Sequence, residues 1–224
     1  MTTTTPMPLR IDLVSDVVCP WCIIGYRQFQ QALAQRAEHI ELDLRWHPFE
    51  LNPQMPPEGQ DLREHMKEKY GASPEQSRGA RQRLLEAGES LGFQFNYSED
   101  MRMVNTFKAH QLLHWAAEHG GSTLQTALKE ALFAAYFTDG RDLSDAAQLI
   151  EVAASVGLDS TEAEAVLVDG RYGLAVREDQ RQWLEQGIQA VPTFVVNEQY
   201  MVQGAQEAEA FGRMLDKLLA NHAA

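Results

Sequence analysis

The stretch Val18-Cys19-Pro20-Trp21-Cys22-Ile23 decides how the 224-residue chain is organised. It contains the only two cysteines of the sequence, and it follows a short apolar run at residues 9–14 that is typical of a β-strand. Apolar residues recur behind the pair with helical spacing. Proline suits the first turn of a helix because its missing N–H would be unpaired there. The sequence therefore predicts a strand, then Cys19, then a helix.

The position of Cys19 at a helix start favours thiol chemistry. Disulfides are attacked by a thiolate, and the unpaired N–H groups and positive dipole end of a helix N-terminus stabilise that anion. Cys22 lies one turn further along, within disulfide reach of Cys19, and we expect it to be the less exposed of the two. The pattern predicts Cys19 as the nucleophile and Cys22 as the resolving thiol, which releases a trapped substrate.

Two structural roles for the cysteine pair compete with this interpretation. A zinc site normally needs four ligands, and the sequence contains no second cysteine pair. His110 and His114 have helical spacing, but we interpret them as part of a helix face. We therefore predict no metal site. A structural disulfide is also disfavoured, because closing a four-residue loop removes very little chain entropy from the unfolded state.

Composition narrows the class of protein. With 44% hydrophobic residues, the chain can bury the core of one large domain or of a domain with an insertion. A net charge of −13 disfavours nucleic acid and anionic membranes as partners. Residues 1–8 lack the basic and apolar segments of a signal peptide, and no later run is long and apolar enough to span a bilayer. We expect a cytoplasmic location, where an isolated Cys-x-x-Cys next to a βα pattern is more often catalytic than structural.

The rest of the sequence indicates an α/β fold interrupted by helices. Residues 40–46 alternate between apolar and charged side chains, which predicts a strand that forms a parallel, right-handed βαβ unit with the first one. Residues 62–187 are expected to be helical throughout. Residues 190–204 predict a hairpin with its turn at Asn197-Glu198-Gln199, followed by a final helix.

Glycines and capping residues divide the helical part. We expect breaks at Gly92, Gly120-Gly121, Gly140 and Gly157, which are positions that would end or interrupt helices. Ser144 and Asp159 are candidate N-caps, and Glu162 follows Asp159 at the spacing of a capping motif.

Three segments resemble the DsbA-like family of thioredoxin-fold thiol–disulfide oxidoreductases, and within it the FrnE-type branch. They are Ser15-Asp16-Val17-Val18-Cys19-Pro20-Trp21-Cys22, Trp46-His47-Pro48-Phe49-Glu50-Leu51-Asn52-Pro53, and Val191-Pro192-Thr193-Phe194 with Gln203-Gly204-Ala205-Gln206. Their order covers essentially the whole chain. The resemblance implies a thioredoxin-like fold with an all-helical insertion. The thioredoxin-like domain would comprise residues 1–53 and 188–224, and the insertion residues 54–187.

The resemblance also implies a site and an activity. The Val191–Pro192 bond is expected to be cis and to lie beside the Cys19 sulfur, so that the Val191 backbone can pair with an extended peptide. Pro20, Trp21 and Thr193 would complete the substrate-binding residues. The implied activity is disulfide exchange or isomerisation in proteins or peptides, with the redox-active Cys19–Cys22 disulfide and no metal or organic cofactor. Glutathione or a dithiol protein would supply electrons, and the sequence leaves the oligomeric state open.

Several neighbours of the thiols have roles that the sequence leaves open. Trp21 cannot place a positive charge near Cys19, so we expect a thiolate stabilised mainly by helix N–H groups and less acidic than in strongly oxidising relatives. Such a thiol suits reduction or isomerisation. Asp16 would relay protons, raise the thiol pKa or bond to a turn. His47 would assist acid–base chemistry or simply end a strand.

Two other functions remain open. Kappa-class glutathione transferases and related isomerases share the insertion architecture, but they carry serine at the first active position. The presence of both cysteines therefore favours redox exchange. A redox-switched, chaperone-like binding module is the non-enzymatic alternative.

Overall fold

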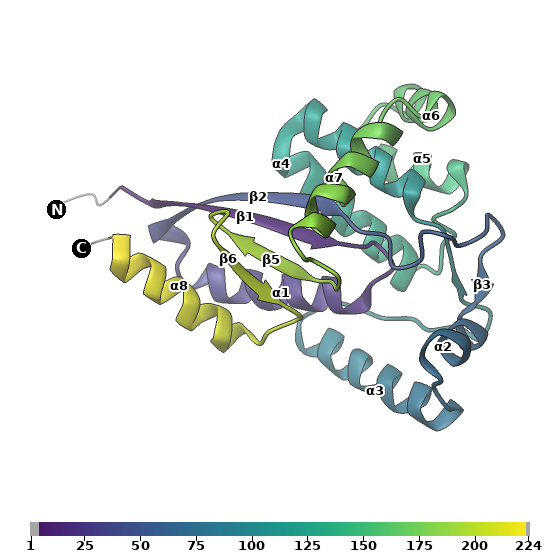
Figure 1. The fold of residues 1–224 in the computed structure, drawn as a ribbon, viewed down its shortest axis with the longest axis horizontal. Coiled ribbons are helices and arrows are strands. Elements are labelled where there is room, and N and C mark those ends of the chain that lie inside the picture. The colour runs from purple at the N-terminus through teal and green to yellow at the C-terminus, as the bar shows by residue number, and fades with distance from the viewer. Residues whose placement is uncertain (1–4, 223–224) are drawn as a thin grey trace.

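A four-stranded mixed sheet forms the centre of the computed structural model (Figure 1). β1 (Met7–Ser15) pairs in parallel with β2 (Ile40–Pro48) and antiparallel with β5 (Thr193–Val196). β6 (Tyr200–Gln203) pairs antiparallel with β5 and gives the order β2-β1-β5-β6. The parallel unit and the hairpin that the sequence predicted are both confirmed.

The structure describes residues 5–222. The ends of the predicted thioredoxin-like domain, residues 1–4 and 223–224, lie outside the described residues.

One face of the sheet is covered by α1 (Pro20–Ala34) and α8 (Ala208–His222). Phe29 of α1 packs against Phe194 of β5 and Phe211 of α8. Its ring centroid is 5.7 Å from that of Phe194 and 5.5 Å from that of Phe211. Burial of aromatic rings is worth several kcal/mol, and edge-on pairs add about 0.5–1.5 kcal/mol. This cluster fixes α1, and with it the cysteines at its start, against the sheet.

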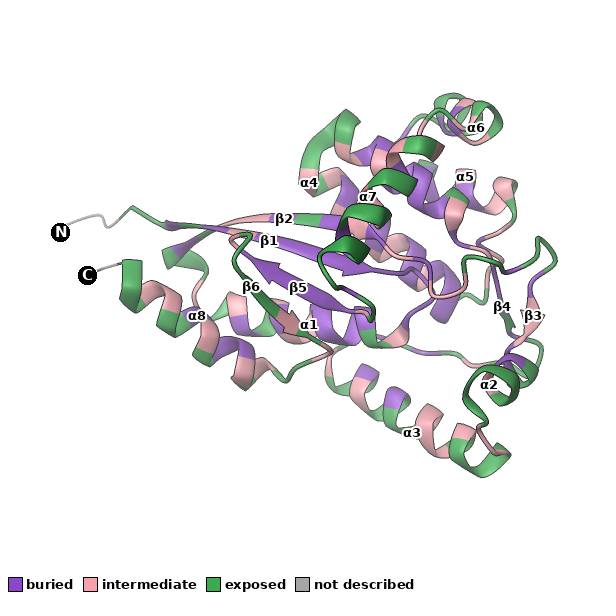
Figure 2. Ribbon diagram, viewed as in Figure 1, coloured by how far each residue is buried: buried purple, intermediate pink, exposed green. Residues whose placement is uncertain are grey.

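The other face of the sheet packs against α7 (Gly173–Glu185). Val14 and Val195 form a separate apolar cluster with Trp183 and Ile188. β1 is consequently buried on both faces near its C-terminal end, where nearly the whole strand is purple in Figure 2. The cysteine segment therefore follows directly from the buried end of the central strand.

The segment between β2 and β5 is mostly helical. The expectation that residues 62–187 are helical throughout is therefore only partly confirmed. The elements of the segment are β3 (Gln60–Asp61), α2 (Leu62–Tyr70), α3 (Pro74–Ser90), β4 (Arg102–Met103), α4 (Phe107–Phe137), α5 (Ala146–Ser155), α6 (Ser160–Asp169) and α7; a 3-10 turn, η1 (Ala37–His39), precedes β2.

The expectation of helix was wrong for the stretch between α3 and α4. Gly92 has a φ of +69°, which ends the helical path, and residues 93–98 form neither helix nor strand. Phe93 and Phe95 pack edge-on with ring centroids 4.9 Å apart, and Phe95 contacts Phe137 of α4 at 5.2 Å. Burial of these rings against α4 thus replaces the expected amphipathic helix.

The predicted break at Gly120-Gly121 is confirmed, because both glycines have non-helical backbone angles and α4 consists of two helical segments joined there by a kink, with a φ of +68° at Gly121. One smaller expectation differs from the structure. Asp145, not Ser144, caps α5 through its carboxylate, which accepts the Ala147 N–H. The Asp159 cap is confirmed, because its carboxylate accepts the Glu162 N–H at 2.9 Å.

No helix in residues 5–222 has the length and apolar character that crossing a bilayer would need.

Candidate active site

Cys19 is the N-cap residue of α1, with extended backbone angles (φ −92°, ψ 109°), and Pro20 occupies the first helical position. The Cys22 N–H donates to the Cys19 carbonyl at 3.1 Å. Both side chains are free thiols; Cys19 retains 4% exposure and Cys22 none. The predicted order of exposure is confirmed. The helix start thus holds an oxidisable pair of thiols, with the sulfur of one nearer to solvent than that of the other.

The Val191–Pro192 loop lies directly against Cys19. Its peptide bond is cis, and the Cys19 thiol donates to the Val191 carbonyl with 3.8 Å between sulfur and oxygen. The Pro192 carbonyl accepts the Gly204 N–H at 2.8 Å, and the buried Thr193 hydroxyl donates to the Ala190 carbonyl at 2.7 Å. These bonds hold the loop in place. Val191 and Pro192 are therefore brought to Cys19, whereas Thr193 supports the loop from within the sheet.

Gly25 permits this close approach and was missed by the sequence reasoning. A Cβ atom on Gly25 would lie 3.1 Å from Cγ of Pro192 and 3.2 Å from Cα of Ala205. Contacts this short would force α1 away from the loop. A glycine within an otherwise apolar helical segment was the available signal.

Pro20 and Trp21 occupy different surroundings. The Trp21 side chain is among the exposed large apolar groups, with 44% of the residue accessible. Pro20 and Val18 instead line an apolar cavity of about 100 Å³, to which α2 and α3 contribute residues such as Met66, Ala80 and Leu84. An apolar surface thus adjoins the cysteine segment on the side of the helical insertion.

The two thiols influence each other, so that their pKa values shift in opposite directions. The hydrogen bond to Cys22 raises the pKa of Cys19, and burial and the charge of Asp16 add to the rise. Burial alone would raise the pKa of Cys22, but the hydrogen bond from Cys19, the Ser15 hydroxyl and the charge of Lys129 outweigh it and lower this pKa. These surroundings therefore favour the thiolate of Cys22 over that of Cys19 within the dithiol.

Asp16 is fully buried and anchors the chain beyond β2. Its carboxylate accepts the Leu51 N–H at 2.8 Å and lies 3.3 Å from Nε2 of His110. Burial would raise the pKa of Asp16, but His110, the Leu51 N–H and the charge of Lys129 together lower it. Of the roles left open by the sequence, the charge of Asp16 raises the pKa of Cys19, whereas its carboxylate bonds to the distant Leu51 N–H rather than to a nearby turn.

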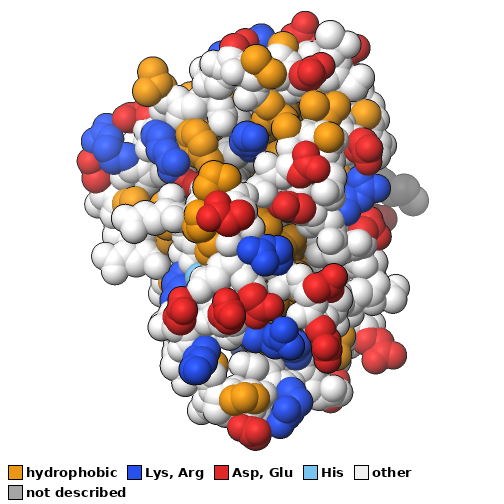
Figure 3. All heavy atoms as spheres, turned by 90° about the vertical axis from the view of Figure 1, so that its right-hand side faces the viewer, with side chains coloured by type: hydrophobic (Ala, Val, Ile, Leu, Met, Phe, Trp, Pro, Cys, Tyr) orange, Lys and Arg blue, Asp and Glu red, His pale blue; other side chains and the backbone are white. Residues whose placement is uncertain are grey.

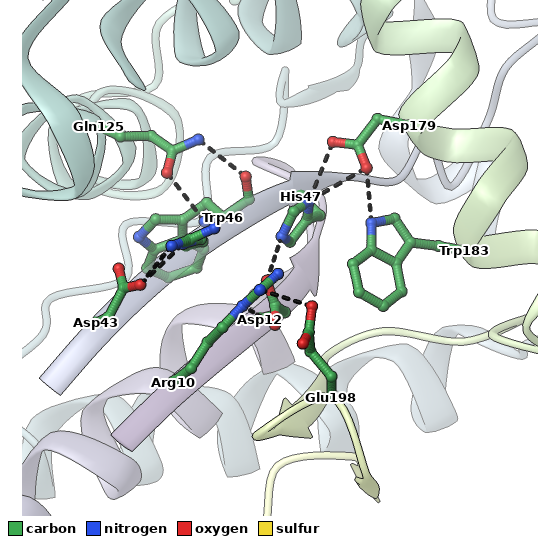
Figure 4. A network of polar contacts seen from close by, with 10 residues as sticks. Arg10, Asp12, Asp43, Trp46, His47, Gln125, Asp179, Trp183 and Glu198 are labelled. Carbon is green, nitrogen blue, oxygen red and sulfur yellow. Dashed lines mark hydrogen bonds and ion pairs between the residues drawn. The ribbon is translucent and has the colours of Figure 1, made fainter. Parts of the chain in front are cut away.

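His47 belongs to a polar network that joins the sheet to α7 (Figure 4). Its Nε2 lies 2.9 Å from Oδ1 of Asp12, and its Nδ1 lies 3.0 Å from Oδ2 of Asp179, which also accepts the Trp183 indole N–H at 2.7 Å. Burial would lower the pKa of His47, but the two carboxylates outweigh it and raise this pKa. His47 thus links β1, β2 and α7 through these hydrogen bonds.

The raised pKa of His47 predicts a pH-dependent stability. Its contribution is fully present below the unfolded-state pKa of about 6.5 and is lost as the pH rises through the higher folded-state pKa. We expect His47→Gln to cost about 1–3 kcal/mol of unfolding free energy at pH values near 6, and less in alkaline solution. Urea unfolding at acidic and alkaline pH measures this. His39→Gln, at an exposed position, is the control. An equal cost of His47→Gln at both pH values would contradict the stabilising role of the protonated His47 side chain.

In the described part of the chain, no three His, Cys, Asp or Glu side chains gather as metal ligands would.

Comparison with known proteins agrees with this geometry. The model of the DSBA-like thioredoxin domain matches residues 10–216. A probable DsbA oxidoreductase from Streptomyces coelicolor is 34% identical with a TM-score of 0.85, over 93% of this chain and 89% of that one. The uncharacterized protein YwbO of Bacillus subtilis is 26% identical over 211 residues, which cover 93% of this chain and 96% of YwbO.

A more distant structure shares the fold. The cytosolic disulfide reductase DsbM from Pseudomonas aeruginosa, solved with GSH, is 19% identical with a TM-score of 0.64, over 94% of this chain and 99% of that one. The family match spans both the cysteine segment and the Val191–Pro192 loop. This chain belongs to the DSBA-like thioredoxin domain family, whose members are thiol–disulfide oxidoreductases.

Proposed function

We propose that this chain is a cytoplasmic, FrnE-type oxidoreductase or isomerase that acts on disulfides of proteins or peptides. The observation that carries the proposal is the placement of the Cys19 sulfur, which lies at a helix start and against the Val191 carbonyl. Cys22 sits behind it with no exposed surface. One sulfur can meet a substrate while the other is reserved for the second step.

Each step of the exchange can be written from these contacts. The proton of Cys19 passes along the thiol–thiol hydrogen bond to Cys22, and the Cys19 thiolate attacks one sulfur of the substrate disulfide. The other substrate sulfur leaves with the bonding electrons and takes the proton that the Cys22 thiol now holds. The Cys22 thiolate then attacks Cys19, the bond between Cys19 and the substrate breaks, the second substrate sulfur leaves as a thiolate with the electron pair, and the Cys19–Cys22 disulfide closes. Two glutathione thiols, or one dithiol protein, return the electron pair.

The surroundings of Cys19 suit a peptide with an apolar side chain near its cysteine. The Val191 backbone lies beside the sulfur, and main-chain pairing with an extended peptide tolerates many sequences. The apolar cavity next to Val18 and Pro20 offers a place for one side chain. Trp21 adds an exposed aromatic contact.

Filling the cavity tests this substrate preference. Ala80→Phe would place a ring in the apolar cavity. For peptides that have a large apolar residue next to the cysteine, we expect KM to rise about tenfold, because the loss of one apolar contact has an effect of this order. Gln82→Phe, on the exposed side of α3, is the matched control. Steady-state kinetics with apolar and glycine-flanked peptide disulfides gives the result. An equal change for both peptides would argue against the cavity as a subsite.

Insulin separates the proposed enzyme from a chaperone-like module. We expect the wild-type chain with glutathione to reduce insulin disulfides, and the Cys19→Ala, Cys22→Ala double variant to be inactive. Suppression of aggregation is measured in parallel on both proteins. Suppression that survives in the double variant, together with no reductase activity in the wild type, would reject the enzyme in favour of the module.

A glutathione-dependent isomerase or transferase of the kappa-class type is a second candidate. The apolar cavity beside the cysteine segment favours it, because such a cavity also fits a small apolar substrate. Cys19→Ser separates the two functions: it should abolish disulfide exchange, whereas an isomerase that needs only bound glutathione would retain activity.

A further inference from the structure

A cleft between α2 and α3 adjoins the apolar cavity beside the cysteine segment. The cleft has a volume of about 400 Å³, against about 100 Å³ for the apolar cavity, and the two share Ser77 and Arg81 of α3 as lining residues. Val18 and Pro20, which flank Cys19 in the sequence, line the apolar cavity but not the cleft. The apolar cavity therefore lies between the cysteine segment and the cleft.

The two helices present an apolar row and a cationic row of side chains. The apolar row lines the cavity and consists of Leu62 and Met66 from α2 and Ala80 and Leu84 from α3. The cationic row lines the cleft and consists of Arg63 and Lys67 from α2 and Arg78 and Arg81 from α3. Within each row, residues of one helix are three or four positions apart, and such residues share a face of a helix. Positive charge thus lies directly beside an apolar surface.

Two of the four cations are already paired with carboxylates. Nη2 of Arg63 lies 3.4 Å from Oδ2 of Asp61, and Nη2 of Arg78 lies 3.0 Å from Oε1 of Glu75. More than half of each arginine side chain is exposed, and exposed pairs of this kind contribute only about 0–1 kcal/mol. These pairs account for one cation from each helix and leave the other one of each row open.

Lys67 and Arg81 are the cations without a carboxylate partner in residues 5–222. The guanidinium carbon of Arg81 instead lies 5.6 Å from the ring centroid of Tyr97, which also lines the apolar cavity. Glu64 and Glu99 line the cleft as well, so its four cations exceed its two carboxylates. The chain as a whole has a net charge of −13, so this excess of positive charge is local. The cleft is therefore complementary to a single anionic group.

We propose that the cleft is a subsite for an acidic side chain of the substrate. The preferred substrates are then peptides that have a large apolar residue next to the disulfide cysteine and an acidic residue just beyond it. The inference rests on the proposed disulfide exchange and names the substrates of that site. The apolar side chain would occupy the cavity beside Pro20, and the carboxylate would lie against Lys67 and Arg81. A guanidinium can hold a carboxylate through two parallel N–H donors, and a lysine adds a point charge.

Peptide disulfides with blocked ends test the subsite, because the varied side chain is then their only difference in charge. Each peptide has leucine next to its cysteine and glutamate, glutamine or lysine at one of the three positions beyond the leucine. One set extends toward the N-terminus and the other toward the C-terminus. For the best glutamate peptide, we expect the wild type to show a kcat/KM about fivefold above that of the matching glutamine peptide, the order expected for two partly exposed ion pairs. The lysine peptide should react more slowly than either.

Variants locate the preference in the cleft. The double variant Lys67→Gln, Arg81→Gln should lose the ratio between glutamate and glutamine peptides, and this ratio is compared within each protein. Arg81→Lys should keep part of it, because the charge remains while the paired N–H donors are lost. Arg83→Gln, at an exposed position of α3 that lines neither the cavity nor the cleft, is the matched control and should keep the full ratio.

Ionic strength provides a test that needs no variant. Raising the salt concentration from about 0.1 to about 1 M shortens the Debye length from about 10 to about 3 Å, so most of the glutamate preference should disappear. A preference that salt leaves unchanged would contradict the ion-pair subsite.

The remaining outcomes separate the inference from the proposed function. Equal kcat/KM values for glutamate and glutamine peptides in the wild type would overturn the subsite. A preference that survives in the double variant, or that Arg83→Gln also removes, would overturn it as well. In these cases turnover is still observed and the proposed function stands. A wild type that turns over none of the peptides would reject the proposed function and the inference together.

Discussion

Cys22→Ser is expected to stop turnover while leaving substrate capture intact, so that the variant accumulates as a mixed disulfide through Cys19. The serine hydroxyl cannot attack the Cys19 adduct, and Cys22 is the one sulfur placed to do so. Turnover should fall about 10³-fold or more, as when a nucleophile is removed. Mass spectrometry of the variant after incubation with a peptide disulfide measures the adduct.

Cys19→Ser is the matched control for this trap. It should form no adduct and show no turnover, because the remaining sulfur is completely buried at the second position of the pair. Equal adduct formation in the two variants would contradict the assignment of nucleophile and resolving thiol.

Asp16→Ala is expected to destabilise the fold by about 3–5 kcal/mol, the cost of leaving a buried charge without its partner. The substitution removes the acceptor of the Leu51 N–H, the partner of His110 and one of the charges that face Lys129. Urea unfolding near neutral pH measures the loss.

A double-mutant cycle separates the charge effect from lost hydrogen bonds. Lys129→Met alone should be neutral or stabilising, because it removes a buried ammonium whose charged form is disfavoured by burial. In the double variant it should recover part of the loss caused by Asp16→Ala. Strictly additive effects would show that Asp16 and Lys129 are not coupled.

Local sequence signals predicted the central parts of the fold and of the site. The strand before Cys19, the proline at the first helical position and the 197–199 turn depend on neighbouring residues, so their patterns can be recognised without knowledge of the fold. Asn197 and Glu198 have positive φ values, as a tight hairpin turn demands. The cysteine segment and Val191-Pro192-Thr193 resemble segments of a known family, and this resemblance predicted that the two distant segments lie side by side.

The missed features depend on contacts between distant parts of the chain. Lys129 is 114 residues from Ser15, and His110 is 94 residues from Asp16, so no spacing rule connects them. Lys129 looks like a solvent-exposed residue in an amphipathic helix, and its burial follows only from the packing of α4 against β2. Phe93 and Phe95 were likewise assigned to a helix, because their contacts with Phe137 join residues that are distant in the sequence.

One face of the molecule shows how its charged side chains are distributed. In the view of Figure 3, acidic and basic side chains are interspersed around apolar patches rather than gathered in a single basic area. This face offers no extended basic groove of the kind that tracks a phosphate backbone. Specificity for a peptide would then rest on the apolar cavity, on the cleft that adjoins it and on the backbone near Cys19.

Equilibration of the wild-type chain with glutathione redox buffers tests the central claim most directly. Alkylation of free thiols followed by mass measurement counts the chains that contain the Cys19–Cys22 disulfide at each ratio of reduced to oxidised glutathione. The account predicts a reversible two-electron transition between dithiol and intramolecular disulfide. Thiols that stay unreactive at every ratio, or that form only stable glutathione adducts, would contradict it.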